Sequence, residues 1–213
     1  MNPGLILTEK RPFKRLAWAP LSRVVPSHLD ARSRLLPSSD QGQTSKCVAF
    51  AMAGWIEFYK WKYFGRAEQI DPNPIYERAK EIDGLGGGDG TTLEAGLQAA
   101  QDLELIHKVD AGYVREVYDI AEVQQALHRY DVVLSAFLIA EGWMNATSDG
   151  WIEPGGRLFG GHAVLLTGYS LNVTQPFYQL QNSWGEENGW RGFNRMPPEM
   201  FAEQFQYGLV WDV

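Results

Sequence analysis

The feature that most constrains the fold is the run CVAFAMAGWIEFYKWKYF at positions 47–64. It is apolar on nearly every side, with charges only at Glu57, Lys60 and Lys62. A helix that is apolar all round is buried in the middle of a domain and does not lie on its surface. The sequence therefore predicts a buried helix over 47–64 that other parts of the chain must cover.

The only cysteine, Cys47, begins this run and follows the polar stretch DQGQTSK. Thr44 and Ser45 are expected to cap the helix by accepting hydrogen bonds from its first N–H groups. A thiol in the first turn of a helix, next to a cation such as Lys46, has a lowered pKa, which favours the nucleophilic thiolate. From position alone, an inert buried cysteine is an equally good interpretation.

Composition narrows the class of protein. A chain of 213 residues is long enough for one substantial domain, or for two halves around a shared cleft. The net charge of −7 argues against a nucleic-acid surface, and no segment is apolar for the length of a transmembrane helix. The N-terminus lacks the pattern of a secretory signal, and a single cysteine excludes an intramolecular disulfide. We therefore expect a cytoplasmic or otherwise reducing compartment.

The charge is unevenly distributed along the chain. Residues 1–36 hold seven Lys and Arg against two acidic residues, a local net charge of +5, which leaves −12 for the rest. This part is rich in Pro and Arg and is expected to be an extended basic arm with little regular structure. It is either a solvated arm lying on an acidic body or a docking arm for an acidic protein partner.

The hydrophobic pattern changes from helical to strand-like along the chain, which predicts an α+β fold in two lobes. After the arm, a helical lobe is expected over 37–110 and a strand-rich lobe over 111–213, together one domain. Besides the buried helix, the predicted helices cover 71–82, a segment from Thr91 and 120–130. The predicted strands lie within 131–140, 160–170, 177–185, 189–196 and 207–213.

A cysteine nucleophile needs a histidine as proton acceptor and a third group that orients the imidazole. His28, His107 and His128 lie in the arm or near polar helix ends. His162 differs, because GGHAVLLTGY places it at the start of a strand directly after two glycines, where a ligand can approach closely. Twenty residues later, LQNSWG offers the amide of Asn182 to the imidazole and the ring of Trp184 to shield that bond.

Three blocks, DQGQTSKCVAF, GGHAVLLTGY and QNSWGEENGWRGF, resemble the signature blocks of the papain-like cysteine peptidases. His162 and Asn182 follow Cys47 by 115 and 135 residues. The family spacing is roughly 130–150 residues, so the fit requires a shortened loop. The resemblance covers residues 26–213 and is nearest to propeptide-poor bacterial or phage-type members. It implies a helical lobe and an antiparallel, barrel-like lobe with the active cleft between them.

The resemblance also implies roles for particular residues. Cys47 would be the nucleophile, His162 the acid–base partner and Asn182 the group that orients it. The Gln41 amide and the Cys47 backbone N–H would form the oxyanion hole. The substrate would be a peptide or protein, and neither a metal nor an organic cofactor is implied.

The Gly-rich stretch at 86–91 would pair with the substrate backbone as an added strand. It does not resemble a phosphate-binding loop, because it lacks the lysine and carries Asp89. The implied substrate-binding residues are Gly87, Gly88, Gly90, Thr91, Gly161 and Trp184.

The sequence also departs from the family pattern. Thr44 stands where the family has a second cysteine, and Lys46 and Val48 replace the usual neighbours of the nucleophile. About 36–40 residues before the core are too few for the usual inhibitory propeptide. Two alternatives therefore stay open: a papain-fold isopeptidase or transamidase, and a structural or assembly protein, such as a virion component, that keeps the fold.

Overall fold

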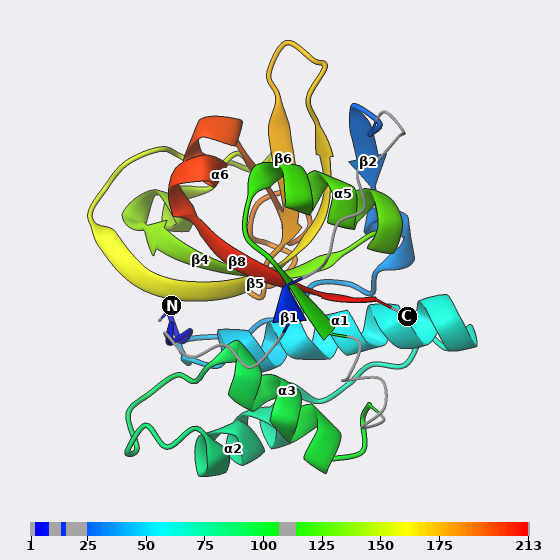
Figure 1. Cartoon of the computed structure of the whole chain (residues 1–213). Helices are drawn as coiled ribbons and strands as arrows, with labels where there is room; N and C mark the ends of the chain where they lie inside the picture. Colours follow the sequence, from blue (N-terminus) through cyan, green and yellow to red (C-terminus); the bar gives the residue numbers. More distant parts are fainter. Residues whose placement is uncertain (1–2, 9–13, 16–24, 107–113, 213) are drawn as a thin grey trace.

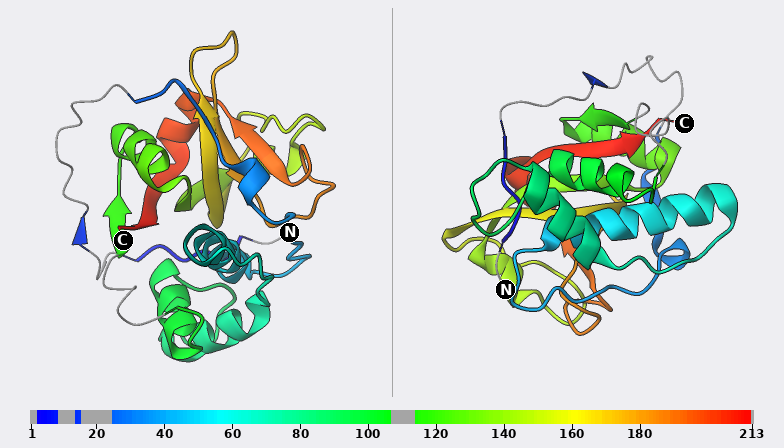
Figure 2. Two further views of the ribbon diagram at one scale, coloured as in Figure 1. Left: turned by 90° about the vertical axis from the view of Figure 1, so that its right-hand side faces the viewer. Right: turned by 90° about the horizontal axis from the view of Figure 1, so that it is seen from below.

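The computed structural model of the chain describes residues 3–8, 14–15, 25–106 and 114–212. The helical first half and the strand-rich second half lie on opposite sides of one long helix, α1 (Figure 1). The left view of Figure 2, turned by 90° about the vertical axis, shows the same two layers. The α+β fold in two lobes that the sequence predicts is therefore confirmed.

Five α-helices and two short 3-10 turns occur in the described part of the chain. They are α1 (Cys47–Phe64), α2 (Pro72–Ile82), α3 (Leu93–Asp102), α5 (Ile120–Tyr130), α6 (Pro198–Gln204), η1 (Arg32–Arg34) and η2 (Glu141–Asn145). The first four agree with the predicted helices to within three residues at each end. Helix α6 is an addition to the predicted set.

Three helices begin with a side-chain cap of the usual kind. Asp71 accepts a hydrogen bond from the Asn73 N–H at the start of α2, and Thr92 accepts one from the Ala95 N–H at the start of α3. Asp119 caps α5 in the same way. These caps fix where each helix starts, and hence where α3 lies beside the Gly-rich loop that precedes it.

Helix α1 begins differently, and the expected capping by Thr44 and Ser45 is wrong. Its N-cap residue is Lys46, which makes no side-chain capping bond. The Thr44 hydroxyl instead donates to the Gln41 carbonyl at 2.6 Å, inside the turn before the helix. The Thr44 hydroxyl therefore bonds within the turn and does not cap the helix. The same bond holds Gln41 close to Cys47.

The described residues contain eight strands in one sheet. They are β1 (Lys14–Arg15), β2 (His28–Asp30), β3 (Val114–Val117), β4 (Val133–Ala140), β5 (Leu158–Ser170), β6 (Phe177–Gln181), β7 (Phe193–Met196) and β8 (Phe205–Trp211). Seven follow the order β1-β3-β8-β4-β5-β6-β7, and β2 pairs with β5 outside this path. All pairs are antiparallel except β1 with β3.

The described part of the expected arm contains regular structure. Strand β2 pairs with β5, with Leu29 opposite Tyr169, and the η1 turn follows it. The Arg32 guanidinium lies 2.6 Å from the Asp30 carboxylate. Residues 1–2, 9–13 and 16–24 of the arm lie outside the described residues. The lobe boundaries near positions 37 and 111 stay a prediction.

Helix α1 joins two hydrophobic cores. One core lies between α1, α2, α3 and the near face of the sheet, and the other lies inside the strand-rich lobe beneath α5 and α6. In the first core, Trp55 of α1 stacks on Trp211 at the end of β8, with ring centroids 3.8 Å apart. This stack connects the last strand of the sheet to the central helix.

None of the described helices has the length and apolar character that crossing a membrane requires.

We expect Trp211→Ala to lower the free energy of unfolding by about 3–5 kcal/mol, as for other buried aromatic truncations. Trp190→Ala is the matched control, because Trp190 is 41% exposed and its ring contacts the Arg32 and Arg195 guanidinium groups without stacking on another tryptophan. That change should cost about 1 kcal/mol or less. Urea unfolding measures both, and equal losses would contradict a role for the stack in joining the lobes.

Candidate active site

The start of α1 lies directly against β5. Cys47 is the first residue of α1 and is fully buried. The backbone of Ala163, the residue after His162 in β5, lies close enough to the sulfur to lower the pKa of the thiol. Helix and strand therefore place Cys47 beside the part of β5 that carries His162, 115 positions away in the sequence, although no hydrogen bond joins the sulfur to the imidazole Nδ1 among the described residues.

His162 is held by Asn182, which follows β6. The imidazole Nε2 lies 2.8 Å from the Asn182 Oδ1. Two neighbours fix the direction of that amide: the Ser183 N–H donates to Oδ1, and the Asn182 Nδ2 donates to the Asn194 Oδ1. Because Oδ1 can only accept, Nε2 must carry the imidazole proton. The other ring nitrogen, Nδ1, is then a proton acceptor.

Nδ1 of His162 is buried and has no hydrogen-bond partner among the described residues. An unpartnered buried acceptor is costly in a folded protein, and such groups are frequently found where chemistry occurs. Here the acceptor belongs to the residue next to the one that contacts the thiol. The arrangement suits removal of a proton from Cys47.

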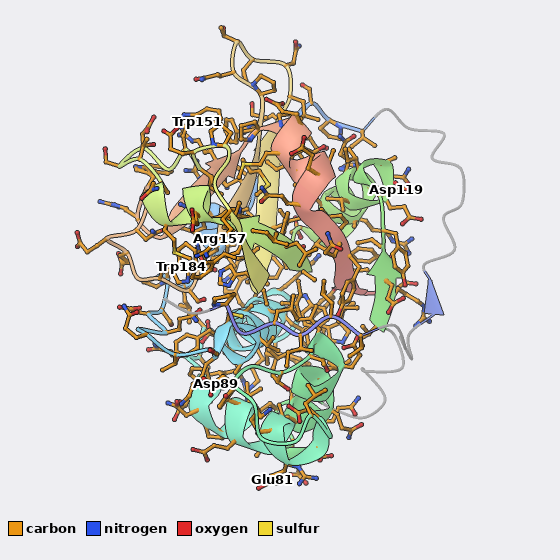
Figure 3. The ribbon with its side chains drawn as sticks, turned by 90° about the vertical axis from the view of Figure 1, so that its left-hand side faces the viewer. Glu81, Asp89, Asp119, Trp151, Arg157 and Trp184 are labelled. Carbon is orange, nitrogen blue, oxygen red and sulfur yellow. The ribbon has the colours of Figure 1, made fainter. Side chains whose placement is uncertain are left out.

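Two tryptophans enclose the imidazole. The ring of Trp184 stacks on His162 with centroids 4.9 Å apart, and Trp143 meets it edge-on at 5.9 Å. Trp184, labelled in Figure 3, lies in the segment just after Asn182. The predicted shielding of the His162–Asn182 bond by this ring agrees with the stack. Burial lowers the pKa of His162 to about 4, although the bond to Asn182 acts in the opposite direction.

Burial also determines the protonation state of the Cys47 thiol. It raises the pKa of Cys47 to about 11, and hydrogen bonds from the backbone of Ala163 and Gly4 offset only part of this effect. In this conformation both partners are neutral at pH 7. The sequence suggested a thiolate beside an imidazolium, and the structure differs because the site is closed to water, which the charged forms need.

Gln41 lies within the same contact between the lobes. Its backbone N–H donates to the Ser183 carbonyl at 2.9 Å, and its side-chain Oε1 accepts from the Ser183 hydroxyl at 2.6 Å. The side-chain Nε2 donates to the Thr44 carbonyl at 2.7 Å. These bonds point the nitrogen of the amide back toward the turn before Cys47. Gln41 therefore has a structural role in addition to the oxyanion role that the resemblance implies.

Of the six candidate substrate-binding residues, Trp184 stacks on His162, and the other five fall into two groups. Gly90, Thr91 and Gly161 line a narrow space in which residues 4–6 of the same chain are bound. Gly87 and Gly88 belong to an exposed part of the loop, where an added Cβ would meet no atom within 4 Å. The structure thus brings the first group beside the candidate nucleophile and leaves the second group at the outer surface.

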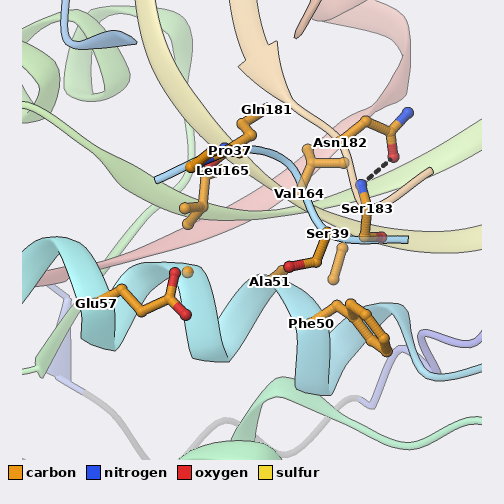
Figure 4. Close-up of a pocket in the computed structure, with 12 residues that line it drawn as sticks. Pro37, Ser39, Phe50, Ala51, Glu57, Val164, Leu165, Gln181, Asn182 and Ser183 are labelled. Carbon is orange, nitrogen blue, oxygen red and sulfur yellow. Dashed lines mark hydrogen bonds between the residues drawn. The ribbon is translucent and has the colours of Figure 1, made fainter. Parts of the chain in front are cut away.

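A small cavity of about 30 Å³ lies behind the site, between α1 and the segments around β5 and β6 (Figure 4). Glu57 forms one end of it, and Asn182 and Ser183 the other. The Glu57 carboxylate accepts from the Ile70 N–H at 2.7 Å, and burial raises its pKa. This volume suits one or two water molecules and is too small for a peptide side chain.

Comparisons with known proteins show the family to which the chain belongs. The family description "papain family cysteine protease" matches residues 76–204, more than half of the chain. Mouse cathepsin K is 27% identical over 194 residues, which cover 79% of this chain and 59% of that protein. Cathepsin B-like cysteine proteinase 6 of Caenorhabditis elegans is 32% identical over 78 residues, or 37% of this chain and 21% of that protein. This chain therefore spans less than two thirds of these relatives.

Solved structures of the same class have the same fold. Xylellain, a cysteine protease from Xylella fastidiosa, superposes with a TM-score of 0.79 at 19% identity, covering 100% of this chain and 96% of that one. Procathepsin B S9 from Trypanosoma congolense gives a TM-score of 0.78 at 12% identity, covering 99% and 86%. The chain therefore has a papain-like fold. It belongs to the papain family of cysteine proteases.

Several residues of the site were not among the sequence-based candidates. Asn194 on β7 accepts from the Asn182 amide, Ser183 fixes both Asn182 and Gln41, and Trp143 closes one side of the imidazole. Ser183 stands in the QNSWG block, but no local pattern marks Asn194 or Trp143. The role of each of the three depends on a neighbour that only the fold supplies. Gly4 and Leu5 were also missed, although a glycine before Leu-Ile-Leu is unusual enough to attract attention.

The lowered pKa of His162 predicts a pH effect on stability. The unfolded chain binds a proton near the ordinary pKa of 6.5, whereas the folded chain binds it only near 4. Stability is therefore full above pH 6.5 and falls as the pH drops toward 4, by up to about 3 kcal/mol. We expect His162→Gln to reduce this slope in urea unfolding between pH 4 and 7. His128→Gln, at an exposed position of α5, is the control, and equal slopes in both variants would contradict the assignment.

Proposed function

We propose that this chain is a cysteine peptidase that hydrolyses peptide bonds through Cys47, His162, Asn182 and Gln41. In the first step, Nδ1 of His162 accepts the thiol proton of Cys47, and the thiolate attacks the carbonyl carbon of the substrate. His162 then gives this proton to the leaving amine. Water hydrolyses the thioester that remains and restores the thiol.

The tetrahedral intermediate carries a negative oxygen that needs donors. The Cys47 backbone N–H, one of the free donors in the first turn of α1, is the first candidate, and the Gln41 amide is the second. The backbone of Thr91 and the Gly161 carbonyl offer donors and acceptors to a peptide in the cleft. These are the groups that residues 4–6 engage in the present structure.

One observation carries the proposal: Asn182 orients the His162 ring. The amide is held by two neighbours, so it fixes the proton on Nε2 and leaves Nδ1 as an acceptor beside the strand residue that contacts the thiol. A histidine retained only for packing would not need its tautomer fixed by a chain of amides. The same geometry serves an isopeptidase, so the substrate assay must separate these two activities.

The proposal is tested by hydrolysis of a fluorogenic dipeptide amide and, in parallel, of a peptide carrying a side-chain amide. We expect Cys47→Ala and His162→Ala each to lower kcat by at least about 10³-fold, because the proton acceptor and the nucleophile act as a unit. His128→Ala should leave kcat unchanged. Unchanged hydrolysis in Cys47→Ala would contradict the peptidase, and cleavage confined to the side-chain amide would favour the isopeptidase.

Gln41→Ala tests the oxyanion hole. We expect kcat to fall by about 10²–10³-fold, the loss typical of one oxyanion donor. The variant should also lose about 1–3 kcal/mol of stability, because the Ser183 hydroxyl and the Thr44 carbonyl lose their partner. Gln43→Ala, two positions along and exposed, is the matched control. A loss of stability with normal kcat would make Gln41 a structural residue only.

A further inference from the structure

The Gly-rich loop between α2 and α3 is exposed along most of its length. Residues 84–89 are all exposed, and four of these six residues are glycines. In Figure 1 the loop extends beyond the ends of both helices, on the side of the molecule where α1 begins. Such a segment does little to fix its own shape, because glycine has the widest choice of backbone conformations. The next residue, Gly90, is nevertheless buried. A group outside the loop must therefore hold Gly90 in place.

Lys80, in the last turn of α2, reaches across to the far end of this loop. Its Nζ donates to the Gly90 carbonyl at 2.9 Å and lies 2.7 Å from one oxygen of the Asp83 carboxylate. Asp83 is the residue at which α2 ends, and its other oxygen accepts from the Leu85 N–H at 3.0 Å. One ammonium group therefore connects the start of the loop to its end. We call Lys80 and Asp83 the loop anchor.

The loop anchor is shielded from water. The side chain of Asp83 is 1% exposed and that of Lys80 is 18% exposed. Burial alone would raise the pKa of Asp83, but the bonds from Lys80 and from the Leu85 N–H hold it below its ordinary value. The carboxylate is therefore charged at neutral pH and keeps the ammonium group beside the Gly90 carbonyl.

Lys80 bonds to the peptide group whose N–H points into the space between the lobes. The Gly90 carbonyl and the Thr91 N–H belong to one trans peptide plane, so they point in opposite directions. Lys80 holds the carbonyl, and the N–H donates to the Gly4 carbonyl at 2.7 Å. Without the bond to Lys80 this plane can rotate, because Gly90, with a φ of 86°, has no side chain to resist it. Lys80 thus fixes the direction of the donor.

The cation on the carbonyl also strengthens the Thr91 N–H as a donor. Hydrogen bonds that share one peptide group polarise one another, and a low local dielectric increases the effect. Thr91 is fully buried, and the bond from Lys80 is charge-assisted. The Thr91 carbonyl accepts from the Ile6 N–H at 2.8 Å, so Thr91 offers a donor and an acceptor to a bound strand. One cation therefore controls both the direction and the strength of this donor.

We propose that Lys80 is a positioning residue for peptide recognition, which acts through the Gly90 carbonyl to orient and polarise the Thr91 N–H toward a backbone carbonyl of the substrate. Asp83 holds Lys80 in this position. The inference rests on the proposed peptidase function for the nature of the substrate, whereas the bonds that carry it belong to the fold. Neither residue of the loop anchor touches the reacting atoms, so neither is a catalytic residue.

Amide NMR of the full chain tests the Thr91 donor without any need for hydrolysis. We expect the paired variant Lys80→Met/Asp83→Asn to raise the hydrogen-exchange rate of the Thr91 amide about three- to tenfold, the effect of weakening one hydrogen bond. Its proton resonance should move upfield, because the N–H is less polarised. The pairing of the two changes leaves no buried charge without a partner, and urea midpoints confirm that the variant is folded. The Gly96 amide, which donates to the Thr92 carbonyl in α3, should exchange at an unchanged rate.

Two single variants serve as controls for the NMR measurement. Lys80→Arg keeps a cation with several donors and should retain the Thr91 exchange rate of the unmodified chain. Arg78→Met removes a cation of the same helix that pairs with Glu81 and Asp102, with its side chain 39% exposed, and it should also leave Thr91 unchanged. Equal Thr91 exchange in the unmodified chain and the paired variant would overturn the inference. An increase in Arg78→Met as large as in the paired variant would do the same.

Two reagents that alkylate Cys47 test the recognition of a peptide. A dipeptidyl chloromethyl ketone carries a backbone that can pair with Thr91, whereas iodoacetamide carries none. Cys47 is the only cysteine, so both rates report the same thiol, and their ratio cancels the access to it that they share. We expect the paired variant to lower the ratio of the ketone rate to the iodoacetamide rate about three- to tenfold. Lys80→Arg and Arg78→Met should retain the ratio, and an unchanged ratio in the paired variant would overturn the inference.

Hydrolysis of the fluorogenic dipeptide amide by the unmodified chain, measured in parallel, separates this inference from the proposed function. A lowered ratio and faster Thr91 exchange in the paired variant, with no hydrolysis by the unmodified chain, would support the role of Lys80 and contradict the peptidase. Hydrolysis together with an unchanged ratio would support the peptidase and overturn the role of Lys80.

Discussion

The packing of the first turn of α1 against β5 is the contact on which the rest of the structure depends. It places Cys47 beside the strand that carries His162, and it closes one end of the core shared by the two lobes. Because α1 is apolar all round, it must be covered by helices on one side and by the sheet on the other. The burial that stabilises the helix thus also places the thiol beside the strand that carries the imidazole.

The same burial disfavours the charged forms of Cys47 and His162 that the proposed reaction needs. Taking Cys47 and His162 out of water raises the pKa of the thiol and lowers that of the imidazole, so each group prefers its neutral form. A thiolate beside an imidazolium needs water or a substrate dipole to stabilise the separated charges. In this conformation burial therefore favours the neutral form of both groups.

The sequence predicted those parts of the fold that periodicity and local chemistry determine. The bounds of α1 and α5 followed from apolar spacing, and the joining of His162 and Asn182 followed from the resemblance of two short blocks. The prediction that Thr44 and Ser45 cap α1 was wrong. The turn before the helix is held instead by the contact between Gln41 and Ser183 and by the bond from Thr44 to Gln41. The placement of residues 4–6 between the lobes could not be predicted, since the pairing partners of Leu5 are 86 and 156 positions away and have no local signature.

The contacts of residues 4–6 also bear on how a peptide would be recognised under the proposed function. The lobes hold them through backbone groups of Thr91 and Gly161, and glycines at the contact leave no side chain to discriminate. Backbone pairing of this kind fixes the position of a peptide but carries little information about its sequence. Selectivity must then come from the few places where a side chain of the bound strand is buried, and in this structure that place is occupied by Leu5.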